Sequence, residues 1–133
     1  MNKEQKMVEE FHKAFDILVA DKPCLPDDET RALRVSLIQE EFAELVVALV
    51  DEDLVEVADA LADLLYVVYG AGLSFGLDLE PLFTEVHRSN MSKTGGRKRE
   101  DGKWEKPESY SKAKLKPIID EMTRRANNDT RNI

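Results

Sequence analysis

Apolar residues recur at helical spacing through most of the first ninety positions. An α-helix turns by about 100° per residue, so side chains three or four positions apart share a face. A first helix is predicted over residues 3–20, with apolar positions at Val8, Phe11, Phe15, Leu18 and Val19. The segment 22–28 contains two prolines within four residues and is predicted to be a loop.

The pattern predicts three further helices before residue 92. The second covers about 29–50, and Asp27 or Asp28 would cap its start. The third covers about 53–75, and the fourth runs from about Asp78 to Asn90. Its proline at position 81 falls in the first turn, where the missing N–H costs nothing.

The third helix is apolar over nearly its whole circumference. A helix of this kind is normally buried. Its acidic positions are therefore unlike an ordinary solvated face, because unpaired buried charge is costly. Its apolar residues include Leu54, Val55, Val57, Leu61, Leu64, Leu65, Val68 and Tyr69.

The segment 92–110 is predicted to be irregular because it contains paired glycines and an Asp-Gly turn signal. It concentrates five cations in an acidic chain, either as a solvated loop or as an anion clamp that faces the acidic site. The five are Lys93, Arg97, Lys98, Arg99 and Lys103. Trp104 is expected to pack this loop down, and no strand is predicted.

A last helix or arm is predicted over about 109–126, interrupted by Pro117 and frayed from Asn127 onward. The fold class is therefore all-α, a bundle of four to five helices that assembles as an oligomer. One domain would span 1–133, with a core over about 3–91 and a closing loop and arm over about 92–126.

Composition narrows the functional classes. The 133 residues carry a net charge of −8, with 42% hydrophobic and 35% charged residues, as in a folded globular domain. The acidity disfavours nucleic-acid binding. A single cysteine, Cys24, excludes an intramolecular disulfide and favours a reducing cytoplasm. We expect no signal peptide and no membrane insertion.

Six carboxylates form the main candidate for chemistry. Three lie close together on one helix surface and three on the next, with a short turn at 51–53 between the two helices. Crowded carboxylates need a compensating cation, and oxygen ligands select Mg²⁺ or Mn²⁺. A solvated acidic face is the alternative. The six are Glu40, Glu41, Glu44, Glu56, Asp59 and Asp63.

Two short motifs resemble those of a known superfamily. Glu41-Phe42-Ala43-Glu44 and Glu56-Val57-Ala58-Asp59 resemble the ExxE and ExxD motifs of the all-α nucleoside triphosphate pyrophosphohydrolases. That superfamily includes MazG-like proteins, phosphoribosyl-ATP pyrophosphohydrolase and dimeric dUTPases. Asn90-Met91-Ser92-Lys93 is similar to its phosphate contacts, and 101–110 to its substrate-closing segment. The resemblance covers roughly 5–119.

Two features depart from the superfamily's pattern. Only eleven residues, 45–55, separate the motifs, which is at or just below the short end of its spacing. The run Ala62-Asp63-Leu64-Leu65 also resembles its Asp-Leu-Leu ending, but Ala60 then stands where a glutamate is expected. We therefore prefer Glu56 and Asp59 as ligands, with Asp63 as an additional one.

The resemblance implies Mg²⁺-dependent hydrolysis between the α and β phosphates of a nucleotide, giving a nucleoside monophosphate and pyrophosphate. The metal ligands would be Glu41, Glu44, Glu56, Asp59 and Asp63, and Glu40 or Glu41 would accept the proton of the attacking water. The substrate would contact Asn90, Lys93, Arg97, Lys103 and Tyr110. The resemblance also implies a homodimer or a dimer of dimers, with the substrate pocket shared between subunits.

The sequence is compatible with more than one substrate and with functions that involve no catalysis. We favour a deoxynucleoside triphosphate such as dUTP, or a non-standard nucleotide, because the long basic loop and tail look like the MazG and dUTPase members. Phosphoribosyl-ATP is the alternative substrate. A regulator that binds metal or nucleotide without turnover, and a purely structural helical dimer, are the non-enzymatic alternatives.

Overall fold

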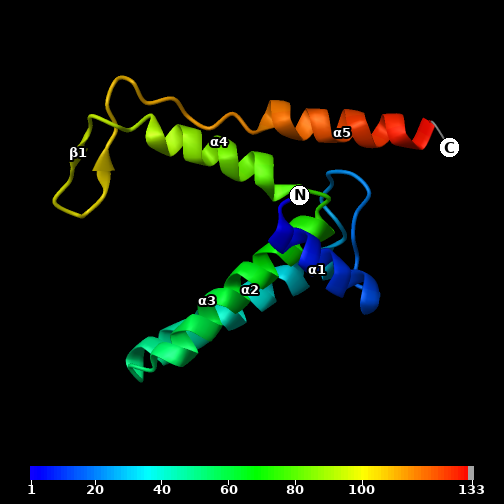
Figure 1. Ribbon diagram of the computed structural model, residues 1–133, viewed down its shortest axis with the longest axis horizontal. Helices are drawn as coiled ribbons and strands as arrows, with labels where there is room; N and C mark the ends of the chain where they lie inside the picture. Colours follow the sequence, from blue (N-terminus) through cyan, green and yellow to red (C-terminus); the bar gives the residue numbers. More distant parts are fainter. Residues whose placement is uncertain (132–133) are drawn as a thin grey trace.

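The computed structural model describes residues 1–131, which fold as five helices and one small hairpin. The predicted all-α class is confirmed, and Figure 1 shows the helices arranged in two limbs that diverge from the amino terminus. In chain order the elements are α1 (Lys3–Ala14), α2 (Asp28–Val50), α3 (Leu54–Ser74), α4 (Leu79–Met91), β1 (Arg97–Lys98), β2 (Trp104–Glu105) and α5 (Lys116–Arg131).

The first limb is the long helical hairpin formed by α2 and α3 (Figure 1). The side chain of Asp27 accepts a hydrogen bond from the backbone N–H of Thr30 at 2.8 Å and caps α2. Asp53 caps α3 in the same way through the N–H of Glu56, at 3.2 Å. These caps satisfy backbone donors that the first turn leaves free. The short connection places α3 beside α2 along its length.

Helix α1 packs across α3 and ties it to the start of α4. The buried amide of Gln5 donates to the carbonyl oxygen of Leu77 at 2.8 Å and accepts from the N–H of Leu79 at 3.0 Å. Both groups lie in the connection between α3 and α4, so one side chain fixes where the second limb leaves the first. The buried hydrophobic residues are Val8, Ala48, Ala60, Leu73 and Leu82.

Two predicted helices have wrong boundaries. Helix α1 ends at Ala14, not near residue 20, because Asp16 adopts a left-handed φ of 54° and turns the chain away. Helix α5 spans Lys116–Arg131, whereas 109–126 was predicted with an interruption at Pro117 and fraying from Asn127. Pro117 instead sits in the first turn of α5, where a proline suits the helix.

The basic segment contains a two-stranded antiparallel hairpin that the sequence pattern did not predict. Arg97 pairs with Glu105 and Lys98 with Trp104, so each strand is only two residues long and shows no detectable alternation. The indole N–H of Trp104 donates to the carbonyl oxygen of Lys93 at 2.6 Å. This bond ties β2 to the segment that follows α4, while the Trp104 side chain itself remains 46% exposed.

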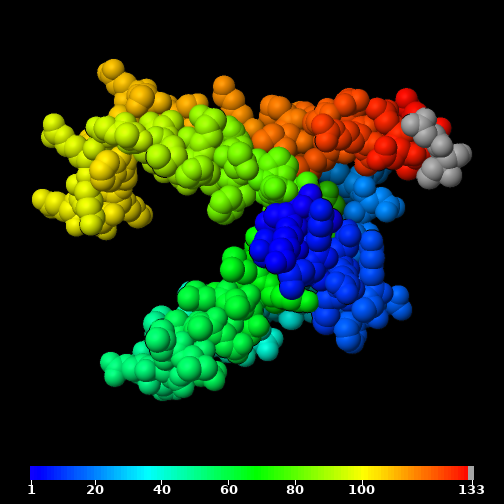
Figure 2. Space-filling model, in the orientation of Figure 1, coloured from blue at the N-terminus to red at the C-terminus, as the bar shows by residue number. Residues whose placement is uncertain are grey.

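The expectation that α3 is buried all round is wrong for the single chain. Leu54 and Val55 are 79% and 76% exposed, because the far half of the α2–α3 limb extends beyond α1. Figure 2 shows the second limb, made of α4, the hairpin and α5, separated from the first by an open wedge. Large apolar side chains therefore remain on the surface of both limbs.

Within residues 1–131, no helix by itself has the length and apolar character needed to cross a bilayer. Helices α3 and α4 reach that threshold only as a pair, and they are bent by 114° at the break between them.

Candidate metal and substrate site

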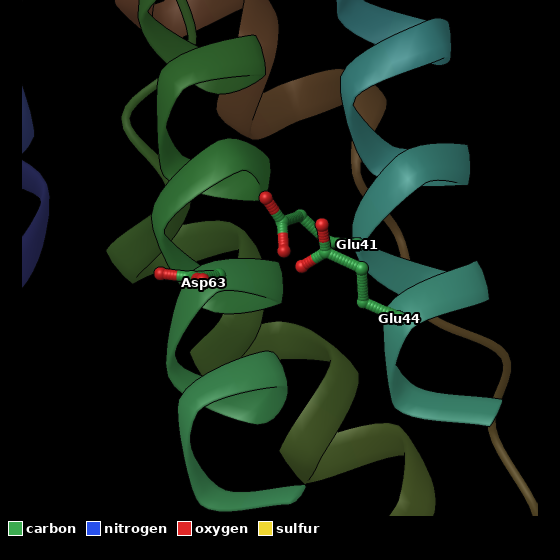
Figure 3. Close-up of side chains that lie close together, drawn as sticks. All are labelled: Glu41, Glu44 and Asp63. Carbon is green, nitrogen blue, oxygen red and sulfur yellow. The ribbon is translucent and has the colours of Figure 1, made fainter. Parts of the chain in front are cut away.

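Three carboxylates converge in the middle of the α2–α3 limb. Glu41 and Glu44 lie one turn apart on α2, and Asp63 lies on the neighbouring part of α3. Each contributes an oxygen to a group whose atoms all lie within 4.8 Å of one another. Figure 3 shows the two glutamates reaching from α2 toward α3, which carries Asp63. The hairpin thus brings together residues that are about twenty positions apart in sequence.

The environment of Glu41 strongly disfavours its charged form. The pKa of this carboxyl is raised to about 7, first by burial, then by a hydrogen bond with Glu44 and by the nearby charges of Glu44, Asp63 and Glu40. Its Oε2 is buried without a hydrogen-bond partner. A buried carboxylate oxygen without a donor is the kind of atom that a bound cation stabilises.

Asp63 shares this environment. Its pKa is raised, first by burial and then by the charges of Asp59 and Glu44, while a hydrogen bond with Glu41 opposes the rise. Two adjacent carboxyl groups are therefore both displaced toward protonation. An ion with two positive charges would reverse this displacement, because it favours the deprotonated form of each ligand.

The other three predicted carboxylates line a groove next to this cluster. The groove has a volume of about 510 Å³ and runs between α2 and α3 toward the turn that joins them. Glu44 belongs to both the cluster and the groove. Asp51 and Asp53 of the turn also line it, and they were not among the predicted site residues. The predicted residues along the groove are Glu40, Glu44, Glu56 and Asp59.

A second cavity of about 270 Å³ lies on the other side of the cluster, between α1, α2 and α3. Glu41 and Asp63 line one part of it, and His12 and Arg34 line another. His12 is only 2% exposed, and neither His12 nor Arg34 was among the predicted site residues. Arg34 could have been identified from the sequence by its position two turns before Glu41, on the same face of the helix.

The predicted substrate-binding residues gather at the junction of α4 and the hairpin. The Lys93 ammonium donates to Asn90 Oδ1 at 3.0 Å and lies 5.8 Å from the ring centroid of Tyr110. Asn90 and Lys93 also line a cavity of about 650 Å³ beside Trp104. Arg97 lies in β1, and Lys103 directly precedes β2.

The acidic and basic groups occupy different limbs. Across residues 1–131, no ion pair or hydrogen bond joins the predicted phosphate contacts to the carboxylates of α2 and α3. A substrate held by both sets would lie in the wedge between the limbs, or between limbs of different chains (Figure 2).

The donor set fits a hard divalent cation. All three converging groups offer carboxylate oxygens as ligands. The buried Oε2 of Glu41 has no hydrogen-bond donor, so a cation bound there would compensate its negative charge. Carboxylates with few other ligands suit Mg²⁺ or Mn²⁺, whereas zinc sites use nitrogen and sulfur. The groove contains further carboxylates within the same limb.

The comparisons with known proteins agree with this chemistry. The sequence pattern of the family described as phosphoribosyl-ATP pyrophosphohydrolase matches residues 8–90, which contain both carboxylate motifs. A comparison with curated proteins gave no match. The match covers more than half of the chain and confirms the superfamily suggested by the motifs. The protein therefore belongs to the phosphoribosyl-ATP pyrophosphohydrolase family of MazG-like all-α enzymes and is a nucleotide pyrophosphohydrolase, a hydrolase acting on phosphoric anhydride bonds.

Proposed function

We propose that the protein hydrolyses the bond between the α and β phosphates of a nucleotide in a Mg²⁺-dependent reaction. The observation that carries this proposal is the convergence of Glu41, Glu44 and Asp63 around one point beside an acidic groove. The products would be a nucleoside monophosphate and pyrophosphate.

The carboxylates would divide into ligands and a proton acceptor. Glu41, Glu44 and Asp63 would hold a cation, with Glu56 and Asp59 available along the groove. A bound Mg²⁺ would neutralise phosphate charge and lower the pKa of a water molecule. Glu40, which lines the groove outside the converging group, can accept a proton from the attacking water, and Glu41 is the alternative.

The phosphates of the substrate also need positively charged partners. Within residues 1–131, the residues that line the groove of the first limb include no Lys or Arg. Lys93 and Asn90 would bind phosphate oxygens, with Arg97, Lys103 and Tyr110 closing over the nucleotide. Because these residues lie on the second limb, substrate binding would draw the acidic and basic groups together around one ligand. Figure 2 shows the wedge that separates these two limbs in one chain.

We propose a homodimer or a dimer of dimers as the active assembly. The chain exposes 9894 Å² of surface, against about 7,100 Å² for a compact monomer of its mass of 15.1 kDa. Much of the exposed surface on the first limb is apolar, as at Val50, Leu54 and Val55. A second copy would cover these side chains, and it could bring its basic segment to the acidic groove.

Two substrates have specific support. A deoxynucleoside triphosphate such as dUTP, or a non-standard nucleotide, fits the long basic segment after α4, which continues well beyond the 8–90 core. Phosphoribosyl-ATP is supported by the description of the family that matches the core. Both substrates contain the same α–β phosphoric anhydride, so the reaction is common to them.

Product analysis tests the reaction and ranks these substrates. The full-length protein is incubated with each common nucleoside triphosphate, dUTP and phosphoribosyl-ATP, with Mg²⁺ or with chelator. Pyrophosphate and orthophosphate are then measured separately. We expect metal-dependent pyrophosphate release, and orthophosphate release in its place would contradict α–β cleavage.

Glu44→Gln and Asp59→Asn test the assignment of the carboxylates. We expect each variant to fold like wild type and to lose at least about 100-fold in kcat, since each lacks a ligand charge. Undiminished turnover in both would rule out this metal site. If no substrate is hydrolysed, a rise in Tm on adding Mg²⁺ and nucleotide would indicate a binding regulator instead.

A further inference from the structure

The smaller cavity beside the carboxylates has the character of a pocket for a ring. Its walls include the apolar and aromatic side chains of Val8, Phe11 and Tyr66, and the two rings meet edge-on at a centroid distance of 5.7 Å. Its volume of about 270 Å³ is just below the range of about 300–1,000 Å³ typical of ligand pockets. This size suits one portion of a nucleotide better than a whole one.

A buried guanidinium lines this cavity without a counterion. Arg34 is only 5% exposed, and across residues 1–131 no carboxylate lies within ion-pair distance of it. One of its terminal nitrogens donates to the carbonyl oxygen of Val67 at 3.3 Å, while its Nε has no hydrogen-bond partner. Leaving such a donor unpaired away from water is costly, so an acceptor at Nε would stabilise the site.

The imidazole ring of His12 lies beside the guanidinium of Arg34. Nδ1 of His12 lies 3.2 Å from the carbonyl oxygen of Leu18. In the neutral ring Nδ1 therefore carries the proton and Nε2 is the acceptor. A Cβ added at Gly70 would collide with Nη2 of Arg34 and would lie 3.0 Å from Nε2 of His12, which places both groups against the same stretch of α3. Gly70 thus makes room for the guanidinium of Arg34 and the ring of His12 side by side.

We propose that this cavity binds the base of the nucleotide and that Arg34 and His12 select bases with a carbonyl group next to a ring N–H. Arg34 would donate to the carbonyl oxygen, and Nε2 of His12 would accept from the N–H. Uracil, thymine and guanine present this edge. Cytosine and adenine present an amino group next to an unprotonated ring nitrogen, which reverses both hydrogen bonds.

The position of the cavity agrees with this assignment. Arg34 and Glu41 are seven residues apart on α2, or about 10 Å along the helix. A base at Arg34 would therefore place its sugar and α-phosphate toward Glu41 and Asp63, which line the same cavity. The remaining phosphates would continue toward Glu44 and the larger groove, since Glu44 links the cluster to that groove.

The inference rests on the proposed function only in taking the ligand to be a nucleotide, so its test uses ligands that lack an α–β bond. Binding of dUMP and dCMP is measured by calorimetry in the presence of Mg²⁺. The two bases have the same ring size and differ at the edge that Arg34 and His12 would contact. We expect wild type to bind dUMP about 10- to 100-fold more tightly than dCMP.

Arg34→Gln should remove most of this preference, because it deletes the buried donor. Arg31→Gln is the matched control, since Arg31 lies one turn earlier on α2 with an exposed side chain paired to Asp28, and it should keep the wild-type ratio. If the Gln variant does not fold, Arg34→Lys retains the buried charge but lacks Nε. That variant should likewise reduce the ratio of the two dissociation constants.

Three results would overturn the inference. They are equal or weaker binding of dUMP by wild type, no measurable binding of either monophosphate, and an unchanged ratio in a folded Arg34 variant. A purely structural Arg34 would lower Tm in the variants and leave the ratio alone. A preserved dUMP preference without pyrophosphate release from any nucleotide would refute the proposed hydrolysis and leave the base pocket standing.

Discussion

Glu41 is destabilising for the metal-free protein at neutral pH. Its pKa rises from 4.5 to about 7 on folding, chiefly through burial. Below the lower value the carboxyl is protonated in both folded and unfolded chains and costs nothing. Between pH 4.5 and 7 the unfolded chain releases the proton while the folded chain retains it, so stability falls as pH rises. Above pH 7 the penalty is constant.

Glu41→Gln should therefore stabilise the metal-free protein while abolishing its activity. At pH 8 in chelator we expect a gain of about 1 kcal/mol after allowance for solvent screening, seen as a rise of a few degrees in Tm. At pH 4 the gain should vanish. The matched control is Glu10→Gln on an exposed part of α1. A variant less stable than wild type at pH 8 would contradict this account.

At the level of single residues, the sequence predicted the carboxylates better than the pocket beside them. Spacing alone placed all six acidic side chains on the two facing helices. It could not say that Asp63 meets Glu41 and Glu44 while Asp59 faces the groove, because this depends on how α3 is rotated against α2. His12 and Arg34 were missed because single polar residues in apolar stretches have no periodicity to mark them.

The connection between α3 and α4 depends on one glycine. Gly76 has a φ of 69°, and a Cβ there would collide with the carbonyl oxygen of Lys22. Gly76→Ala should lower stability by about 2 kcal/mol or more, measured by urea denaturation, because backbone strain adds to the collision.

Gly102→Ala is the matched control for this prediction. Gly102 also has a positive φ, 84°, but no atom lies within 4 Å of an added Cβ. Its substitution should therefore cost only the backbone strain, about 1 kcal/mol. Equal losses in the two variants would show that the contact with the 22–28 loop is unimportant.

Helix boundaries were predictable where a capping residue marked them. Asp27, one of the two predicted caps of the second helix, accepts a backbone hydrogen bond at the start of α2, and Asp53 and Asp78 do the same at the starts of α3 and α4. The end of α1 was missed because apolar spacing continues through Leu18 into a loop that packs on α3. The start of α5 was missed because Pro117 was taken as an interruption, although prolines are favoured in a first turn.

At the scale of the molecule, the exposed apolar surface predicts association. The chain exposes about 2,800 Å² more than a compact monomer of its mass, whereas a standard interface buries about 800 Å² on each partner. We expect light scattering to give two or four times the mass of 15.1 kDa at micromolar concentration. A fully active monomer would contradict this prediction.

The arrangement of the two limbs could not be predicted from sequence. Periodicity identified an apolar third helix but could not distinguish burial inside one chain from burial against another. The direction of the second limb is fixed by Gln5 through its hydrogen bonds to Leu77 and Leu79. Such long-range polar contacts produce no periodic pattern in the sequence. The number of helices was predictable, whereas their relative placement was not.

The separation of acidic and basic groups on different limbs makes genetic complementation possible. If each active site joins the carboxylates of one chain to Lys93 of another, two inactive variants could rescue each other. Mixing Glu44→Gln with Lys93→Gln and allowing subunits to exchange should restore about a quarter of the wild-type activity, because half of the dimers are mixed and one of their two sites is intact. If each site is built from a single chain, the mixture should stay as inactive as its parents.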